Sequence, residues 1–148
     1  MEITLPDQIK LYFDKAGLGN PTFIFIHGGG GDTSHLAPQF YFFARRGTAI
    51  NLDLRGYGKS DKPIKYGTIA QYADDVAYLC RQLKITRPII IGHSMGGMVA
   101  VELAAKYRTL PATIVLISSG VLFPQKALED EEKVLSGLRS VSYRTASQ

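Results

Sequence analysis

The sequence lacks the features that mark secreted and membrane-bound proteins. Its one cysteine, Cys80, cannot form an internal disulfide. The opening residues, Met1 to Pro6, contain neither the basic stretch nor the apolar stretch of a signal peptide. No apolar run reaches the roughly 18 residues that a membrane-spanning helix needs. These absences predict a soluble, cytoplasmic protein with no membrane partner.

Positive charge is not concentrated anywhere in the chain, although the formal net charge is +4. The only basic doublet is Arg45-Arg46, and Lys59, Lys62 and Lys65 are separated by other residues. A nucleic-acid-binding protein would carry a basic stripe or face with aromatic side chains between the cations. We therefore expect no nucleic-acid partner. The 45% of hydrophobic residues and 20% of charged residues are ordinary globular values, and 148 residues suit one domain.

What the sequence does contain is a regular alternation of short apolar runs and helical stretches. Four apolar runs are typical of strands buried on both faces: residues 23–26, 48–54, 88–92 and 112–118. Apolar residues at helical spacing predict three helices between them: residues 34–46, 68–84 and 95–108. Residues 2–16 alternate in polarity and predict an antiparallel hairpin. The fold class is therefore α/β, with a mostly parallel, doubly wound sheet that begins with the hairpin.

A serine motif follows the third apolar run, where a parallel sheet places its functional groups. The residues read Gly92-His93-Ser94-Met95-Gly96-Gly97, a G-x-S-x-G pattern between a predicted strand and a predicted helix. The sharp turn strains the serine backbone, so its neighbours Gly92 and Gly96 must be small. Ser94 then stands exposed at a helix N-terminus, where the amide of Met95 can bind an oxyanion. A purely structural glycine turn is the alternative, and the flanking strand and helix favour the functional interpretation.

A second glycine-rich segment follows the first apolar run. It reads His27-Gly28-Gly29-Gly30-Gly31. Four consecutive glycines are costly to order, which indicates that another group must approach the backbone closely. Taken alone, the segment could be a flexible loop. Together with the serine motif, it predicts the loop that provides the second amide of an oxyanion hole.

These motifs resemble the α/β-hydrolase superfamily, in its cap-bearing esterase, C–C hydrolase and perhydrolase-like branch. His27-Gly28-Gly29 is similar to the family's H-G-x oxyanion loop, and residues 92–97 match its nucleophile elbow. A third segment, Asp53-Leu54-Arg55-Gly56-Tyr57-Gly58-Lys59-Ser60, is similar to the family's D-x-R-G-x-G-x-S loop. The match extends over nearly the whole chain.

The resemblance implies an activity and a role for each motif. Ser94 would be the nucleophile, and the amides of Gly29 and Met95 would form the oxyanion hole. The supporting positions of the elbow and the glycine loop are then His27, Gly28, Gly92, His93 and Gly96, while Asp53 and Arg55 shape their loop. The expected reaction is hydrolysis of a small ester or related acyl substrate, and it needs no metal and no cofactor. A serine nucleophile argues against the epoxide hydrolase and haloalkane dehalogenase branches, which use aspartate.

The partners of the nucleophile are missing from the pattern. In the family the acid and the histidine follow the serine, yet the only histidines are His27, His35 and His93. We expect residues 1–120 to form the N-terminal part of the hydrolase core, truncated after the sixth strand. Residues 121–148 would begin a cap helix and end in a polar tail. An unpaired sheet edge would then favour self-association or binding of a complementing C-terminal half.

Two alternatives stay open. The first is a catalytically silent fragment that keeps the fold as a binding or interaction module, which the missing histidine favours. The second is a dinucleotide-binding oxidoreductase, with residues 22–53 as strand, glycine loop, helix and strand, and Asp53 near the ribose. The second alternative needs a small residue at Thr33 and leaves the serine motif unexplained.

Overall fold

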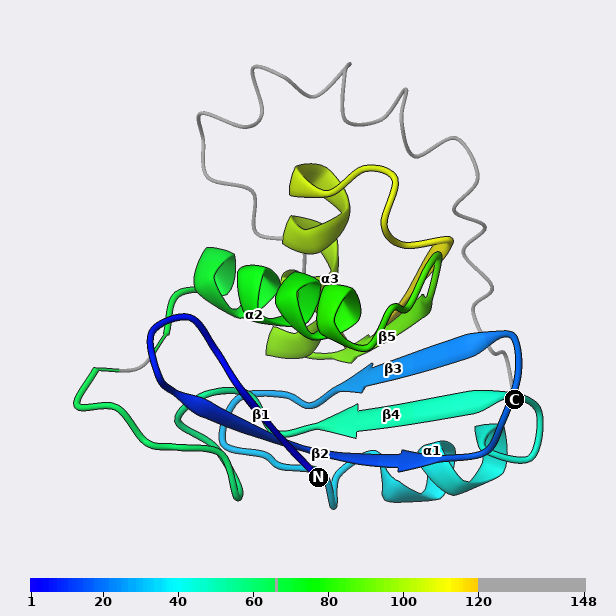
Figure 1. Cartoon of the computed structure of the whole chain (residues 1–148), viewed down its shortest axis with the longest axis horizontal. Helices are drawn as coiled ribbons and strands as arrows, with labels where there is room; N and C mark the ends of the chain where they lie inside the picture. The colour runs from blue at the N-terminus through cyan, green and yellow to red at the C-terminus, as the bar shows by residue number, and fades with distance from the viewer. Residues whose placement is uncertain (66, 120–148) are drawn as a thin grey trace.

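The computed structural model describes residues 1–65 and 67–119, which form one six-stranded sheet with helices on both faces (Figure 1). The strand order is β1-β2-β4-β3-β5-β6. The chain starts with β1 (Glu2–Thr4) and β2 (Lys10–Ala16), which pair antiparallel with each other. The predicted hairpin is therefore confirmed. β2 then pairs antiparallel with β4, so the hairpin extends one side of the sheet.

The remaining strands are parallel and lie close to where the apolar runs predict them. They are β3 (Thr22–Ile26), β4 (Thr48–Leu52), β5 (Ile89–His93) and β6 (Thr113–Ile117). β3 lies between β4 and β5, and β5 pairs with β6. Every crossover between consecutive parallel strands contains a helix, as βαβ units require. The predicted mostly parallel α/β architecture is confirmed.

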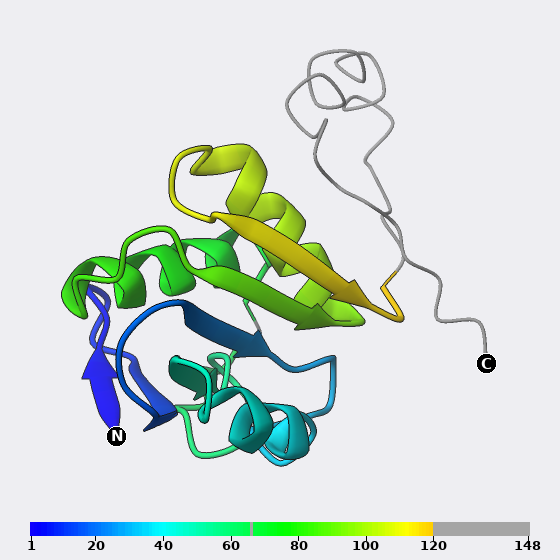
Figure 2. The same ribbon diagram turned by 90° about the vertical axis from the view of Figure 1, so that its right-hand side faces the viewer.

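The helices cover both faces of the sheet. α1 (Ala37–Phe43) lies on one face, and α2 (Ile69–Gln82) and α3 (Met95–Lys106) lie on the other (Figures 1 and 2). The face under α2 and α3 holds the larger core, which includes Phe13, Ile24, Ile26, Ile50, Leu52, Tyr72, Val76, Leu79, Ile90, Val99 and Leu103. The smaller core under α1 is built on Phe23, Phe25, Leu36, Phe40, Ala49 and Ile91.

The ends of several elements differ from the sequence prediction. The helix expected over 34–46 spans only Ala37–Phe43, because Asp32 accepts the amide hydrogen of Ser34 and holds the preceding residues in a turn. The strand expected to reach residue 54 ends at Leu52, since Asp53 turns to make loop contacts. α3 ends at Lys106 rather than at residue 108. Thr68 caps the N-terminus of α2, where its hydroxyl oxygen accepts the amide hydrogen of Gln71 at 3.2 Å.

The expected division at residue 120 falls at the end of the described part. The segment predicted to begin a cap, residues 121–148, lies outside the described residues. No helix in residues 1–65 and 67–119 is long and apolar enough to cross a bilayer.

Candidate active site

Ser94 occupies the sharp turn between β5 and α3. Its backbone has a φ of 49° and a ψ of −115°, an unfavourable conformation for a residue with a side chain. The Ser94 amide donates a hydrogen bond to the carbonyl of Ile117 at 2.9 Å, which ties the turn to the end of β6. The residue is exposed, and its side chain makes no capping hydrogen bond to α3. The hydroxyl is therefore available for chemistry at the carboxyl end of the sheet.

Two glycines make this turn sterically possible. A Cβ atom on Gly96 would collide with the carbonyl oxygens of Ile26 and His27, at the end of β3. A Cβ atom on Gly92 would collide with the carbonyl of Gly96. In both cases the obstacle is backbone, which cannot rotate away. These contacts account for the small residues on both sides of the serine motif.

The glycine loop lies directly beside Ser94, because β3 and β5 are neighbouring parallel strands. A Cβ atom on Gly28 would lie 3.2 Å from Cβ of Ser94, and one on Gly29 would lie 3.8 Å from Sδ of Met95. The structure thus brings together the two segments that the sequence analysis paired.

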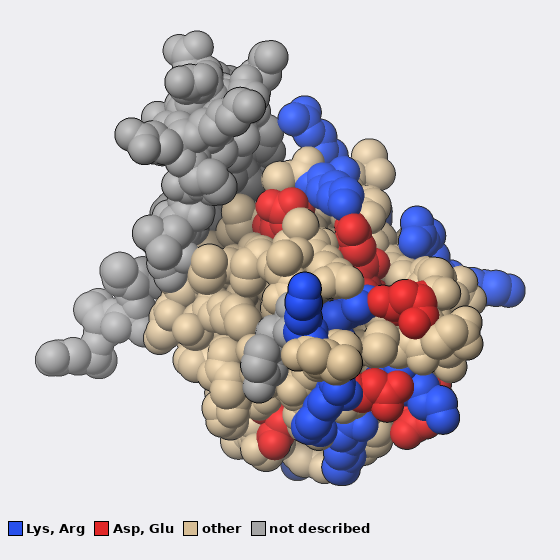
Figure 3. Space-filling view, turned by 90° about the vertical axis from the view of Figure 1, so that its left-hand side faces the viewer, with Lys and Arg blue, Asp and Glu red and all other residues tan. Residues whose placement is uncertain are grey.

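Figure 3 shows the molecule from the side toward which β3 and β4 run, where acidic and basic side chains are interspersed.

The two amides expected to bind an oxyanion have no competing acceptor. Within residues 1–65 and 67–119, neither the Gly29 amide nor the Met95 amide donates a hydrogen bond to another protein group. Met95 is the first residue of α3, where amides have no partner within the helix. Gly29 is exposed, and the turn around it is closed by a 3.1 Å hydrogen bond from the Gly31 amide to the Gly28 carbonyl. Both donors are therefore available to an anionic ligand.

Both ring nitrogens of His27 form hydrogen bonds with the protein backbone. The residue is buried; Nδ1 donates to the carbonyl of Gly28 at 2.7 Å, and Nε2 accepts the amide hydrogen of Leu54 at 3.1 Å. Burial lowers the pKa of His27 below its ordinary value, so the ring is neutral near pH 7. With both ring nitrogens occupied, His27 cannot accept the proton of Ser94. Its contacts are those of a loop support.

Neither of the other two histidines is hydrogen-bonded to Ser94 in the described part of the chain. His93 is half-buried beside Gly28, and within the described residues its buried Nδ1 has no hydrogen-bond partner. His35 is exposed, and its ring lies against Gly31. Within the described residues, Ser94 therefore has no histidine as a hydrogen-bond partner.

Asp53 ties the loop after β4 to the glycine loop. Its carboxylate is buried and accepts the amide hydrogens of Thr33 at 2.6 Å and Lys59 at 2.7 Å. Its backbone carbonyl also accepts the hydroxyl of Ser60 at 2.6 Å. Both carboxylate oxygens thus serve the fold, in line with the loop-shaping role that the sequence analysis gave to this residue.

Arg55 anchors the same loop to α2. Its guanidinium donates two hydrogen bonds of 2.6 Å to the carboxylate of Asp75 and one of 2.7 Å to Asp7. The arginine and Asp75 are buried, whereas the Asp7 side chain is 47% exposed. The bidentate pairing with Asp75 raises the pKa of Arg55 above its ordinary value, so the guanidinium stays charged.

We predict that Asp75→Asn lowers the free energy of unfolding by about 2 kcal/mol, because Arg55 loses half of its charge pairing while it stays buried. The adjacent Asp74 is a matched control. It is half-exposed and pairs with the exposed Lys106 at 2.7 Å, so Asp74→Asn should cost less than about 1 kcal/mol. Urea unfolding followed by circular dichroism measures both. Equal losses in the two variants would contradict the prediction.

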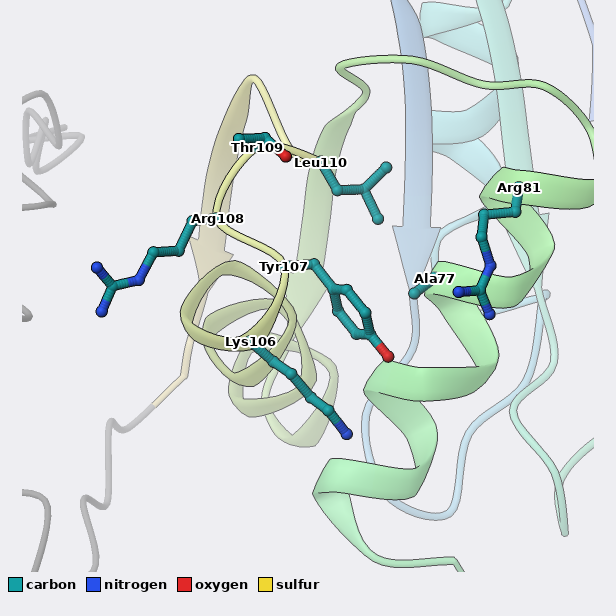
Figure 4. A pocket seen from close by; sticks show the side chains of 7 residues that line it. All are labelled: Ala77, Arg81, Lys106, Tyr107, Arg108, Thr109 and Leu110. Atoms are coloured by element: carbon teal, nitrogen blue, oxygen red, sulfur yellow. The ribbon is translucent and has the colours of Figure 1, made fainter.

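A hollow on the surface lies far from Ser94, at the other end of α3. It has a volume of about 460 Å³ and is lined by Ala77, Arg81, Lys106, Tyr107, Arg108, Thr109 and Leu110 (Figure 4). Arg108 points away from the other side chains, and Lys106 is already paired with Asp74. The hollow therefore does not belong to the candidate active site.

In the described part of the chain, no cluster of His, Cys, Asp and Glu could hold a metal ion.

The sequence analysis missed one residue of this region, Tyr57. Its ring packs edge-on against His27, and its hydroxyl reaches the sulfur of Met95. The available signal was its position inside the D-x-R-G-x-G-x-S segment, where an aromatic residue lies two positions after Arg55.

The chain is similar to a known protein family and to individual members of it. Residues 21–144 match the family model described as alpha/beta hydrolase fold. The chain is 35% identical to 2-(acetamidomethylene)succinate hydrolase of Mesorhizobium japonicum, over 82% of this chain and 44% of that protein. It is 33% identical to the AB hydrolase superfamily protein YisY of Bacillus subtilis, over 72% of this chain and 40% of that protein.

A solved structure agrees with these matches. A thermophilic esterase from Thermogutta terrifontis superposes with a TM-score of 0.77 at 30% identity, over 95% of this chain and 53% of that one. The chain therefore spans only between 40% and 53% of the length of these three relatives.

Proposed function

The chain belongs to the alpha/beta hydrolase fold family, and on this premise we propose that it supplies the nucleophile and the oxyanion hole of a serine hydrolase. The proposed substrate is a small molecule with an ester or a related acyl group. One observation carries the proposal: Ser94 is exposed and has a φ of 49° in the turn between a buried strand and a helix. Such a conformation costs about 1–3 kcal/mol and is found mainly where it serves function.

The proposed reaction has two halves. Oγ of Ser94 attacks the acyl carbon while its proton passes to a base, and the carbonyl oxygen becomes an oxyanion bound by the amides of Gly29 and Met95. Collapse of this intermediate breaks the bond to the leaving alcohol, which takes the proton from the base. Water then attacks the acyl-enzyme, passes one proton to the base and forms a second oxyanion. Collapse of this intermediate breaks the bond to Oγ of Ser94, which takes that proton back from the base, and the carboxylic acid is released.

The base and its orienting acid are proposed to come from outside these 148 residues, in the same chain or from a second one. Two facts support this. His27 uses both ring nitrogens in backbone hydrogen bonds, and every histidine of the sequence precedes Ser94. In addition, the chain matches less than half the length of two of the three relatives: 44% of the first and 40% of the second. The hydrolase and esterase names of the relatives support hydrolysis and leave the substrate open.

The experiment that tests the proposal is active-site labelling with a fluorophosphonate, which reacts only with an activated serine. We expect stoichiometric labelling of Ser94 in the product of the complete reading frame, located by mass spectrometry of the peptide that contains it. Heat-denatured protein is the matched control and should remain unlabelled. Label on another serine, or none at all, would count against the assignment.

A catalytically silent protein remains the second candidate, because one observation favours it: the described residues place no histidine on Ser94. This candidate predicts no labelling of either the 148-residue chain or the complete product. Labelling of the chain alone would exclude silence.

Cytoplasmic location and self-association also remain proposals. β6 is the last strand of the described sheet, and its Val115 is 40% exposed. Such an edge can accept another strand, which supports pairing with a second copy or with a complementing segment.

A further inference from the structure

Tyr57 contacts both segments that carry the proposed oxyanion donors. It lies in the loop that follows β4, and its ring meets the ring of His27 edge-on at a centroid distance of 5.2 Å. Its hydroxyl donates a hydrogen bond to Sδ of Met95 at 3.8 Å. The first contact reaches the glycine loop after β3, and the second reaches the elbow after β5. One side chain thus bridges three neighbouring strand ends.

The contact with His27 bears on the Gly29 amide. Nδ1 of His27 donates to the carbonyl of Gly28 at 2.7 Å. The carbonyl of Gly28 and the N–H of Gly29 belong to one planar peptide group, so fixing the direction of the first fixes the direction of the second. Nε2 of His27 is held in turn by the Leu54 amide at 3.1 Å. Tyr57 closes the remaining side of this ring, which keeps the Gly29 amide in one orientation.

The contact with Met95 bears on the other donor. A methionine side chain has three rotatable bonds and fills space adaptably, so it does not hold its own backbone in place. The hydroxyl of Tyr57 gives the Met95 sulfur a fixed partner, and a Cβ atom on Gly29 would lie 3.8 Å from the same sulfur. The thioether is therefore held between the loop after β4 and the glycine loop.

The ring of Tyr57 is itself held from α2. Tyr72 is buried, and its ring lies 6.3 Å from that of Tyr57. Burial raises the pKa of Tyr72 to about 12, so Tyr72 stays neutral beside Tyr57. The aromatic contact with α2 limits the movement of the Tyr57 ring between His27 and Met95.

We propose that Tyr57 is a positioning residue of the oxyanion hole, which sets the Met95 and Gly29 amides relative to each other through Met95 and His27. The inference rests on the proposed function. A positioning role differs from a structural one in its kinetic signature, since an oxyanion forms in the transition state and not in the bound substrate. Loss of positioning should therefore lower kcat and leave KM nearly unchanged.

The test measures hydrolysis of p-nitrophenyl acetate by the product of the complete reading frame. Loss of a whole oxyanion donor costs about 10²–10³-fold in kcat, so Tyr57→Phe, which only loosens one, should cost about 5–20-fold with KM within about twofold. Tyr78→Phe is the matched control, because Tyr78 is a half-buried tyrosine of α2 whose ring faces Arg81. It should leave both constants unchanged.

A double variant tests the route of the effect. Met95→Leu removes the sulfur acceptor and keeps the volume, so Tyr57→Phe should add less than about twofold to the loss in Met95→Leu. Full additivity of the two losses would overturn the proposal, as would an unchanged kcat in Tyr57→Phe. If Tyr57→Phe melts below the assay temperature, Met95→Leu alone replaces it, because it removes the same contact from the other partner. Its expected loss is about 2–5-fold in kcat, and no loss there overturns the proposal.

Ser94→Ala, assayed in parallel, separates the two levels of inference. An inactive Ser94→Ala beside a fully active Tyr57→Phe overturns the positioning role alone. An active Ser94→Ala, or a wild-type protein without turnover, overturns the proposed function and the positioning role with it.

Discussion

Ser94→Ala is expected to lower the kcat of ester hydrolysis by about 10⁴–10⁶-fold in the product of the complete reading frame. The substitution removes the atom that is proposed to attack the acyl carbon and leaves the two free amides in place. The residual rate should then be that of water acting on a substrate bound at the oxyanion hole. The fold should persist, because the Ser94 side chain makes no capping hydrogen bond to α3. Steady-state kinetics on p-nitrophenyl acetate, with circular dichroism of both proteins, measures this.

Ser34→Ala provides the control for the loss of a serine hydroxyl. Ser34 is an exposed residue of the loop between β3 and α1, and its structural hydrogen bonds are made by its backbone. Its variant should retain the wild-type kcat. If Ser94→Ala turns over the ester at the wild-type rate, the nucleophile has been assigned to the wrong residue, whatever the fold.

The core strands could be predicted because the physical cause of each is local. Phe23 to Ile26 and Pro88 to Gly92 are apolar on consecutive positions, which only a strand covered on both faces can satisfy. The strand order was not predictable in the same way. It places β3 between β4 and β5, so the glycine loop lies beside the elbow although 60 residues separate Gly29 from Ile89.

The ends of α1 and β4 were beyond a periodicity argument, because side chains decide them. Asp32 draws the chain into a turn that shortens α1, and Asp53 leaves the sheet to bind Thr33 and Lys59. Neither contact has a signature in the apolar pattern. Tyr57 was missed for a related reason: its contacts with His27 and Met95 join loops that come together only in the folded sheet.

The dinucleotide alternative loses its two supports in the structure. A dinucleotide-binding loop places its glycines at the N-terminus of the following helix, where the pyrophosphate binds. Here α1 begins at Ala37, and a turn over Asp32 to Ser34 separates it from Gly31. The acid that would bind a ribose, Asp53, already accepts two backbone amides with its two oxygens. The glycine loop therefore serves the close approach to Ser94 rather than a phosphate.

The close contact between the serine turn and the end of β3 leads to a second prediction, a large loss of stability when Gly96 gains a side chain. Gly96→Ala should lower the free energy of unfolding by more than about 3 kcal/mol, because the new methyl group would meet the carbonyl oxygens of Ile26 and His27. These atoms belong to the end of β3, in the middle of the sheet, whereas Gly96 lies in the first turn of α3, so relief would require the start of α3 to move away from β3. Urea unfolding of the chain, followed by circular dichroism, measures the loss.

Gly29→Ala distinguishes this collision from a general intolerance of side chains around Ser94. The nearest atom to a Cβ on Gly29 is Sδ of Met95 at 3.8 Å, an ordinary van der Waals distance, and the amide hydrogen is retained. Gly29→Ala should therefore unfold within about 1 kcal/mol of the wild type. If Gly96→Ala is equally stable, the elbow does not pack against the end of β3 as described. The short distance between Ser94 and the glycine loop, on which the proposed oxyanion hole depends, would then be lost as well.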